Sequence, residues 1–233
     1  KLIKDRYIGK PISRIISKKN FWKNTFNINE NTLDPRPDSE TIIESILKHI
    51  SDKSKSFKIL DLGSGSGCLG LSLIDEYENS KVTFLDISKN SLQAVKANAL
   101  KFDLYQKSKF VNLDWRNSDW EKHLLKFEKN IKFDLIVSNP PYIASNDIKN
   151  LQIEVKDYEP IIALDGGKDG LDAYRFIMPK LNNLLKENGR VFIEIGKGQQ
   201  NQVEIIASDC GLFPIDFVKD FSGIIRVLIF IIK

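Results

Sequence analysis

Residues 57–67 read Phe57-Lys58-Ile59-Leu60-Asp61-Leu62-Gly63-Ser64-Gly65-Ser66-Gly67, an apolar run that leads directly into alternating glycines. The run over residues 57–62 has the length and composition of a β-strand that is buried on both faces. Glycines at alternate positions let a backbone pass close to a ligand and adopt dihedral angles that are closed to other residues. A strand, a glycine loop and a helix in this order are typical of α/β folds that bind ligands at the carboxyl ends of their strands.

Strands and helices continue to alternate after this segment. Further apolar, β-branched runs predict strands at residues 81–86, 109–113, 133–138 and 190–195. Helical spacing of apolar residues predicts one helix after Asp38 or Ser39, a second after Ser88, and a third over residues 171–185 that is closed by Asn188-Gly189. Alternation of this kind favours an α/β fold with a doubly wound, mainly parallel sheet.

The two ends of the chain have different patterns. Residues 213–219 and 225–231 flank Asp220-Phe221-Ser222-Gly223 and predict an antiparallel C-terminal hairpin, which makes the expected sheet seven-stranded. The apolar tail over residues 224–232 is short and contains Arg226, so we expect a core strand there and no membrane span. Residues 1–36 are less regular and are expected to form a linker and a short strand pair that packs on the core.

The composition is that of an ordinary globular protein. The 233 residues, 42% hydrophobic and 28% charged, suit one domain or one domain with an appendage. The net charge of +4 is only mildly basic, and no block of like charges marks a nucleic-acid tail. Cys68 and Cys210 lack metal-ligand spacing, and His49 and His123 lie in polar, helical surroundings, so no metal is expected. The cysteine usage and the charged start without an apolar leader favour a cytoplasmic location.

Two cofactors fit the glycine loop on spacing alone. Gly65-x-Gly67-x-x-Gly70 matches the dinucleotide fingerprint, in which Asp86 would bind a ribose hydroxyl. Asp61-x-Gly63-x-Gly65-x-Gly67 instead resembles the loop that binds S-adenosylmethionine, with Asp86 on the same kind of hydroxyl pair. Asp61 suits the ammonium group of the methionine part. This acid and the motif at residues 139–142 favour S-adenosylmethionine, because a hydride-transfer enzyme has no use for that motif.

The pair Asp114-Trp115 follows the predicted strand at residues 109–113. The carboxylate could accept a hydrogen bond from an adenine amino group, and the indole could cover the face of the ring. The alternative is a core tryptophan beside a surface acid. For Trp120 and Trp22 we expect packing roles.

The motif Asn139-Pro140-Pro141-Tyr142 directly follows the predicted strand at residues 133–138. If a planar NH2 group donates to the Asn139 side-chain oxygen and the Pro140 carbonyl, its nitrogen gains electron density and is held in place. Tyr142 can stack on the flat group, and the prolines stiffen the loop that carries both acceptors. A methyl group on a sulfonium is already activated, so the main task is to align the nitrogen with it. A base and a side-chain amide fit these four residues equally well.

Several further segments carry a more specific signal. They are Pro35-Arg36-Pro37-Asp38-Ser39-Glu40, Tyr158-Glu159-Pro160, Ala163-Leu164-Asp165-Gly166-Gly167, Asp169-Gly170-Leu171, Glu194-Ile195-Gly196 with Gln199, and Asp220 with Ser222-Gly223 and Arg226. On these segments the chain, from about residue 11 to residue 227, resembles the PrmC/HemK family, the protein-(glutamine-N5) methyltransferases that modify peptide chain release factors. Ser39 stands where the family usually has threonine.

The resemblance implies a Rossmann-like class I S-adenosylmethionine-dependent methyltransferase, with residues 37–233 as its catalytic domain. It implies methyl transfer to the side-chain amide nitrogen of the glutamine in the Gly-Gly-Gln loop of release factors, which modulates translation termination, with S-adenosylhomocysteine as the product. The implied cofactor-binding residues are Gly63, Ser64, Gly65, Ser66, Gly67, Asp86, Trp115 and Asn139. The implied substrate-binding residues are Asn139, Pro140, Pro141 and Tyr142, of which Asn139, Pro140 and Tyr142 are expected to be catalytic.

Two other classes of function are compatible with the same motifs. A nucleic-acid methyltransferase that acts on adenine N6 or guanine N2 would use the same four residues on a flipped base, but it should carry a stronger basic patch or an added recognition domain. A non-catalytic scaffold should have a damaged motif, and both motifs are whole. The expected partners are therefore release factors, with no membrane and no stable nucleic-acid binding. Members of the family usually carry an N-terminal helical domain that helps to recruit the release factor, and residues 1–36 are expected to be a remnant after it.

Overall fold

The structure is a computed structural model that describes residues 2–232. Within these residues, seven strands form one sheet in the order β5-β4-β3-β6-β7-β9-β8. The strands are β3 (Lys58–Leu62), β4 (Lys81–Asp86), β5 (Ser108–Asn112), β6 (Phe133–Ser138), β7 (Leu185–Glu194), β8 (Leu212–Lys219) and β9 (Ile225–Ile232). Neighbouring strands from β5 to β7 are parallel, and β9 is antiparallel to both β7 and β8. The mainly parallel, seven-stranded sheet with a C-terminal antiparallel hairpin is confirmed.

The order of the strands reverses between β3 and β6. The chain runs outward from β3 to β4 and β5 and then returns to place β6 on the other side of β3. Leu62 pairs with Ser138 in register, so Gly63 and Asn139 leave the sheet at the same level. Ligands of open α/β sheets bind at such a reversal, outside the carboxyl ends of the strands.

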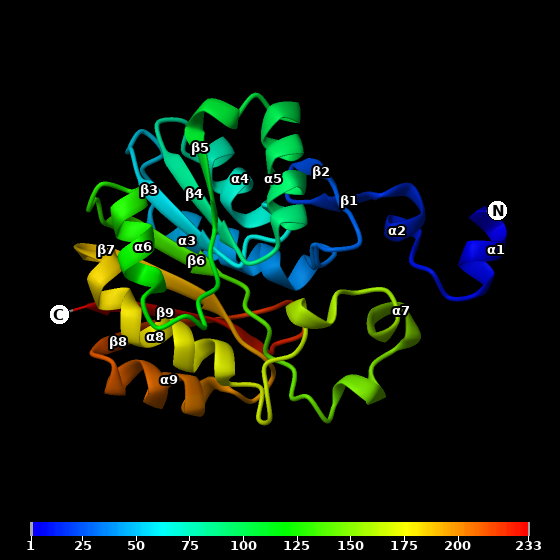
Figure 1. The fold of residues 1–233 in the computed structure, drawn as a ribbon. Helices are drawn as coiled ribbons and strands as arrows, with labels where there is room; N and C mark the ends of the chain where they lie inside the picture. The colour runs from blue at the N-terminus through cyan, green and yellow to red at the C-terminus, as the bar shows by residue number, and fades with distance from the viewer. Residues whose placement is uncertain (1, 233) are drawn as a thin grey trace.

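Helices cover both faces of the sheet (Figure 1). One face carries α3 (Glu40–His49), α4 (Cys68–Glu76) and α5 (Lys89–Lys101), and the other carries α6 (Trp120–Phe127), α8 (Asp172–Leu184) and α9 (Gln200–Asp209). Successive side chains of a strand point to opposite faces. Ile59 therefore packs in the core on the first side and Leu60 in the core on the second. The chain is doubly wound, as predicted.

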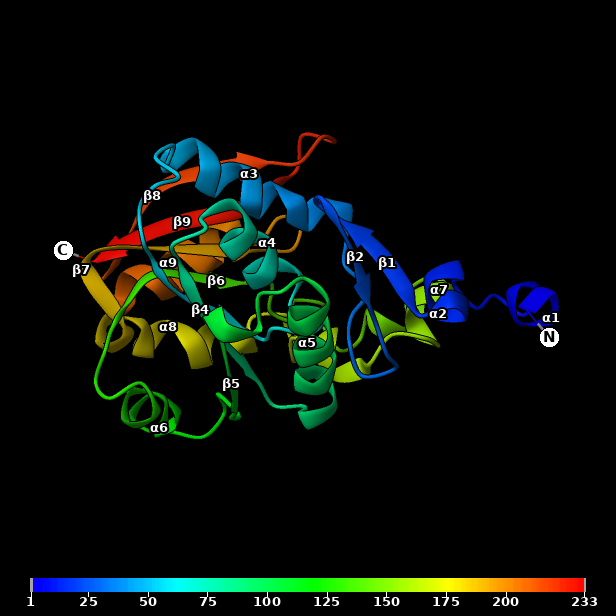
Figure 2. The same ribbon diagram turned by 90° about the horizontal axis from the view of Figure 1, so that it is seen from above.

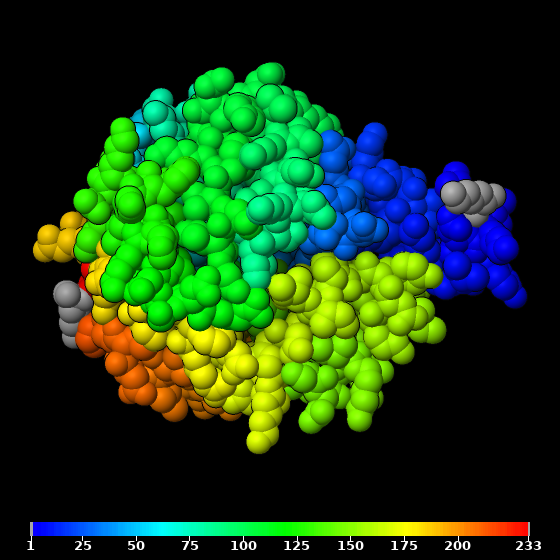
Figure 3. Space-filling model, in the orientation of Figure 1, coloured from blue at the N-terminus to red at the C-terminus, as the bar shows by residue number. Residues whose placement is uncertain are grey.

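The N-terminal segment consists of α1 (Leu2–Tyr7), α2 (Ile12–Ile16), β1 (Lys18–Phe21) and β2 (Asn24–Asn27). The two strands form an antiparallel pair, and Phe21 and Phe26 are buried in the core on the side of α3, α4 and α5. Helix α1 buries no residue and projects from the body of the molecule (Figures 2 and 3). A strand pair therefore lies within residues 1–36, while the division of the chain into domains 1–36 and 37–233 stays a prediction.

Residues 143–165 form an excursion between β6 and α8 that the sequence patterns did not indicate. It contains η3 (Ile148–Asn150), α7 (Ile153–Lys156) and η4 (Ile161–Ala163), and a bridge between Ile143 and Asp165 closes it. The excursion lies against the N-terminal segment, where the Tyr158 hydroxyl donates to the Ile8 carbonyl at 3.1 Å. Figure 1 shows α7 on the same side of the molecule as α2.

Two expected helix ends differ from the structure. Ser88 caps α5 as predicted, because its side chain accepts from the Ser91 N–H. Ser39 precedes α3 but makes no side-chain cap, since its hydroxyl is used elsewhere. Helix α8 ends at Leu184, and Asn188-Gly189 lies inside β7, so the predicted closure of this helix by Asn188-Gly189 was wrong. No helix among residues 2–232 is long and apolar enough to cross a bilayer.

Candidate active site

A cleft with a cavity volume of about 320 Å³ lies at the carboxyl ends of β3, β4 and β6. Seven of the eight residues predicted to bind the cofactor line it: Gly63, Ser64, Gly65, Ser66, Asp86, Trp115 and Asn139. The eighth, Gly67, begins α4 as its N-cap with φ +80° and is not among the lining residues. The fold thus gathers residues from four separate segments in one cleft, and their roles in binding stay predictions.

The glycine loop turns back over the end of β4. The N–H groups of Gly63 and Ser64 both donate to the Leu85 carbonyl, at 2.8 and 3.1 Å. Gly63 has φ +72°, and a Cβ there would stand 2.8 Å from the Trp115 ring, so both the turn and the packed indole require glycine. Gly65 has φ +53°, and nothing lies within 4 Å of the place where its Cβ would be. Its backbone is therefore open to a ligand in the cleft.

Two buried carboxylates line the cleft beside this loop. Asp61 is 1% exposed, and its Oδ2 accepts from the Gly70 N–H at 2.9 Å. Burial raises the pKa of Asp61 from 3.8 to about 7; the Gly70 hydrogen bond opposes the rise and the nearby Asp86 adds to it. Asp86 accepts from the N–H groups of Gly65 and Ser88, and burial raises its pKa too. A cationic ligand group would relieve the cost of keeping these carboxylates ionised.

The residues of the cleft fit S-adenosylmethionine. The Ser64 hydroxyl is buried and has no hydrogen-bond partner among the described residues, so it is free for a polar ligand group. Asp61 and Asp86 both line the cleft, and their contacts with an ammonium group and a ribose hydroxyl pair stay predictions. No group of three or more His, Cys, Asp or Glu side chains in residues 2–232 could hold a metal ion.

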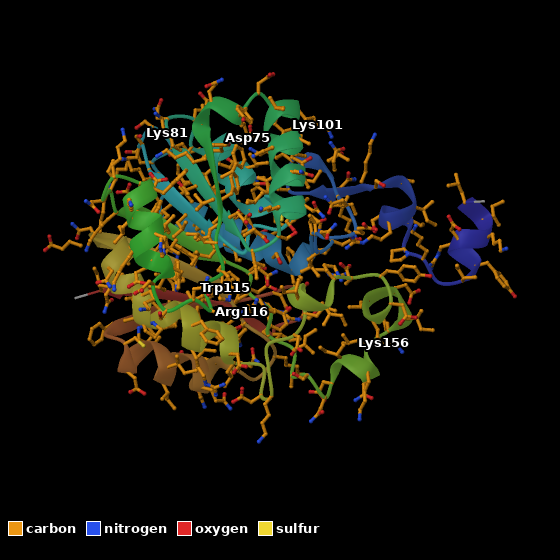
Figure 4. The ribbon with its side chains drawn as sticks, in the orientation of Figure 1. Asp75, Lys81, Lys101, Trp115, Arg116 and Lys156 are labelled. Carbon is orange, nitrogen blue, oxygen red and sulfur yellow. The ribbon has the colours of Figure 1, made fainter. Side chains whose placement is uncertain are left out.

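Trp115 and Arg116 lie side by side near the middle of the molecule (Figure 4). The Trp115 ring packs against the backbone of Gly63 and lines the cleft, where it can cover one face of a ligand ring. Asp114 is held by Arg116, whose Nε donates to both carboxylate oxygens at 2.9 and 3.0 Å. The Arg116 guanidinium holds the pKa of Asp114 below its ordinary value. Both Asp114 oxygens therefore already accept from Arg116, and a hydrogen bond from an adenine amino group would have to share them.

A second cavity, of about 290 Å³, adjoins the cleft and is lined by Pro140 and Tyr142. Asn139 lines both cavities, together with Leu33, Arg36 and Ala163. Pro141 lines the first cavity only. The residue expected to act on the substrate therefore lies where the two cavities meet.

The Asn139 side chain belongs to a hydrogen-bond network with three other side chains. Its Nδ2 donates to the Ser39 Oγ at 2.8 Å, and the Ser39 hydroxyl donates to Glu194 Oε2 at 2.5 Å. The Tyr142 hydroxyl donates to Glu194 Oε1 at 3.2 Å. With its hydroxyl bound to Glu194, Tyr142 can offer only a ring edge or face to the second cavity. Burial raises the pKa of Tyr142 well above its ordinary value, so the hydroxyl keeps its proton.

Ser39 and Glu194 were not among the predicted site residues. Both stand in segments that carry the family resemblance, but the resemblance itself gave them no role. A signal for Glu194 was present in the sequence: it is a carboxylate inside the apolar run Val191-Phe192-Ile193-Glu194-Ile195. A buried charge within a core strand requires partners, and such groups cluster at functional sites.

Comparison with known proteins shows the family of the chain. Residues 38–155 match the methyltransferase small domain family. The release factor glutamine methyltransferase of Caulobacter vibrioides is 37% identical over 219 residues, which is 94% of this chain and 72% of that protein. The enzyme of the same name from Clostridium acetobutylicum is 38% identical over 219 residues, 94% of this chain and 74% of that protein.

A solved structure shows the same fold. It is that of the release factor-specific protein-(glutamine-N5) methyltransferase from Alicyclobacillus acidocaldarius, with a TM-score of 0.53 and 24% identity. The alignment covers 85% of this chain and 94% of that one.

Proposed function

Since the chain belongs to the release factor glutamine methyltransferases, a family of S-adenosylmethionine-dependent enzymes, we propose that it methylates the side-chain amide nitrogen of a glutamine in peptide chain release factors. The glutamine of a Gly-Gly-Gln loop is the proposed acceptor, and modulation of translation termination is the proposed consequence. The proposal includes a cytoplasmic location, where release factors meet the ribosome.

The observation that carries the proposal is the position of Asn139 between the two cavities. The first cavity holds the glycine loop, Asp61 and Asp86, and therefore suits the cofactor. The second is lined by Pro140 and Tyr142, the residues expected to grip the substrate amide. A glutamine that enters the second cavity would bring its amide to Asn139.

The residues of this chain act by binding and orienting. Bound S-adenosylmethionine would supply a methyl group on a sulfonium: transfer forms the N–CH3 bond, breaks the S–CH3 bond, and releases S-adenosylhomocysteine and one amide proton. Asn139 Oδ1 and the Pro140 carbonyl are the acceptors for the two amide hydrogens of the glutamine. These acceptors hold the nitrogen in position and raise its electron density, and good alignment can supply about 7–11 kcal/mol of the barrier reduction. Since the prolines restrict the loop, the acceptors are preorganised.

A nucleic-acid base is the less favoured acceptor. The chain carries a net charge of only +4, whereas proteins that bind nucleic acid concentrate basic residues on one face or along one helix. A flipped base would also need to leave its stack, which costs a few kcal/mol and is usually offset by contacts with the strand. The excursion at residues 143–165, which borders the second cavity, contains Glu154, Asp157 and Glu159 among its charged residues.

The test presents methyl-labelled S-adenosylmethionine and the protein to a release factor, ribosomal RNA and DNA in parallel. We expect label in the release factor only, and none in a release factor whose Gly-Gly-Gln glutamine is replaced by glutamate. Asn139→Ala should abolish transfer while it leaves S-adenosylhomocysteine binding mostly in place. Asn79→Ala is the matched control, because Asn79 is an exposed asparagine whose side chain donates to the Ser54 carbonyl away from the cleft. Label confined to nucleic acid would overturn the proposal.

A further inference from the structure

Glu194, at the end of β7, is a buried carboxylate that lines the second cavity and connects to Asn139 through Ser39. It is 1% exposed, and its two oxygens accept from the Ser39 and Tyr142 hydroxyls. The O···O distance to Ser39 is 2.5 Å, which is typical of a hydroxyl that donates to an ionised carboxylate. The Ser39 Oγ at the same time receives the Asn139 Nδ2–H at 2.8 Å.

The number of protons on Ser39 fixes the direction of this chain of hydrogen bonds. A serine hydroxyl has one hydrogen to donate and lone pairs to accept with. Once that hydrogen is committed to Glu194, the oxygen can only accept from Asn139. The Asn139 carboxamide must then turn its nitrogen to Ser39, and its oxygen is left for the second cavity.

A neutral Glu194 would remove this constraint. Its own proton could be donated to the Ser39 oxygen, and the Ser39 hydrogen would then be free to donate to Asn139 Oδ1. The carboxamide would turn over and present its NH2 group to the cavity. Two NH2 groups that face each other, one from Asn139 and one from the glutamine, cannot form a hydrogen bond, because both are donors.

We propose that Glu194 is a positioning residue which, through the Ser39 hydroxyl, sets the Asn139 carboxamide so that its oxygen faces the substrate amide. The inference deepens the proposed function and rests on it for the identity of the substrate. It also explains why Ser39, although it precedes α3, does not cap the helix. Its hydroxyl is committed to Glu194.

The surroundings of Glu194 place its pKa between pH 6 and pH 8. The titratable and charged groups around it are Asp38 before α3, Tyr142 after β6, Tyr174 on α8, Arg226 on β9 and Cys68 at the start of α4. Burial raises the pKa of Glu194 from 4.5 to about 7, against the hydrogen bonds of Ser39 and Tyr142 and the charge of Arg226. The ionised form, which sets the polarity, therefore gains population as the pH rises from 6 to 8.

The first experiment replaces the hydroxyl. Ser39→Ala removes the acceptor for Asn139 Nδ2, and kcat should fall by about tenfold or more, the equivalent of one positioning hydrogen bond. The dissociation constant of S-adenosylhomocysteine should change much less than kcat, although Ser39 lines the first cavity. Ser39→Thr keeps the hydroxyl and should recover most of the rate. An alanine variant with full kcat would overturn the proposal.

The second experiment is the pH profile of kcat at saturating cofactor, which reports groups in the complex with substrate and cofactor. For a pKa of about 7, kcat of the unaltered protein should fall roughly tenfold from pH 8 to pH 6. Glu194→Gln should be active and flat over this range, because an amide can accept from Ser39 and does not titrate. Glu128→Gln is the control: Glu128 is also buried and accepts from a hydroxyl, that of Thr83, at 2.6 Å. Glu128→Gln should keep the fall of kcat toward pH 6. A Glu194→Gln variant that also keeps this fall would overturn the proposal.

A third measurement does not depend on methyl transfer. The side-chain NH2 resonance of Asn139, assigned in 15N-labelled protein by its loss in Asn139→Ala, should shift between pH 6 and pH 8 in the presence of S-adenosylhomocysteine. The shift should vanish in Glu194→Gln. A protein that methylates no release factor yet shows this shift would refute the proposed function alone. A protein that methylates release factors and shows no shift would refute the positioning role alone.

Discussion

Asp61 is a buried carboxyl group whose ionisation is opposed by its surroundings. It is 1% exposed, and burial raises its pKa from 3.8 to about 7. Above pH 7 the folded protein must therefore hold a carboxylate that the unfolded chain would leave in water. A carboxyl with these two pKa values costs the folded state on the order of 4 kcal/mol at pH 8. A buried carboxylate that stays charged at this cost, in a cleft, is typical of a group that binds a cationic ligand.

Asp61→Asn should therefore stabilise the ligand-free protein at alkaline pH. The stabilising contribution of a raised acid is fully present below its unfolded pKa of 3.8 and is lost as the pH rises through the folded value of about 7. We expect a gain in the free energy of unfolding of up to about 4 kcal/mol at pH 8 and less than half of that at pH 5. An asparagine oxygen can still accept from the Gly70 N–H. Urea unfolding at the two pH values measures the gain.

The control for this variant is Asp52→Asn, at an exposed aspartate whose partner is Ser54. It should show no gain that grows with pH. A destabilised Asp61→Asn protein at pH 8 would mean that the Asp61 carboxylate is held by interactions stronger than its desolvation.

At the scale of single residues, the sequence predicted the residues that line the cleft better than it predicted the hydrogen-bond network of Ser39 and Glu194. Gly63, Asp86 and Asn139 could be placed because each follows a recognisable strand, and the ends of parallel strands meet at one edge of the sheet. Ser39 and Glu194 could not, because the two residues are 155 positions apart and their contact depends on how α3 lies against β7. Single-residue patterns carry no information about such a contact.

Among the elements, the excursion at residues 143–165 is joined to the N-terminal part of the chain by a charged cluster. Glu159 accepts from Arg14 and from Arg36, the latter at 2.9 Å, and from the Asp34 N–H at 3.1 Å. Arg14 also forms an ion pair with Asp34 at 2.8 Å. The cluster joins α2, the chain before α3 and the excursion. It thereby fixes one wall of the second cavity.

Glu159→Ala should loosen this wall. Removal of one partner leaves Arg14 buried with an incomplete set of acceptors, and we expect a loss of about 3 kcal/mol in the free energy of unfolding. Hydrogen–deuterium exchange should rise in residues 143–165 more than in the central strands. Asp169→Ala removes a carboxylate from an exposed pair with Arg175 and should have little effect on either measurement. Unchanged exchange in the excursion of Glu159→Ala would show that its apolar contacts suffice to hold it.

At the boundary between α8 and β7, the helix end predicted from the sequence was wrong. Asn188-Gly189 is a common helix ending, but the helix stops earlier because Leu185 already has the extended conformation, with φ −87° and ψ 139°. Leu185 pairs with Phe133, while Arg190 pairs with Leu135, so the residues between them form an irregular bulge in β7. Lys186 within this bulge donates to Asp134 on β6. Pairing with a neighbouring strand prevailed over a local turn signal.

For the molecule as a whole, the sheet and the N-terminal strand pair were predictable, whereas the excursion at residues 143–165 was not. The strands are apolar runs of the kind that a buried parallel sheet requires. The N-terminal segment and residues 143–165 border the second cavity through Leu33, Arg36, Leu151 and Val155. Residues 143–165 have neither a helical nor a strand period. The second cavity is therefore lined in part by a segment whose structure the sequence patterns left open.

Binding of S-adenosylhomocysteine should couple the whole molecule to pH through Asp61. The ammonium group of the ligand lies next to Asp61 in the proposed complex, and an adjacent positive charge lowers the pKa of a carboxyl. With a pKa of about 7 in the free protein, binding at pH 7 should release about half a proton per molecule. Titration calorimetry in two buffers of different ionisation enthalpy measures this number. The affinity should rise between pH 6 and pH 8, because the ionised form of Asp61 is the one that binds.

Two variants separate Asp61 from the other buried acid with a raised pKa. Asp61→Asn should bind S-adenosylhomocysteine more weakly and release no proton, whereas Glu194→Gln should bind it normally and release as many protons as the unaltered protein. The contrast follows from position, because Asp61 lines the cofactor cleft and Glu194 lines only the second cavity. If proton release instead persists in Asp61→Asn and disappears in Glu194→Gln, the ammonium group contacts Glu194 and not Asp61. The proposed direction of the cofactor in the cleft would then be wrong.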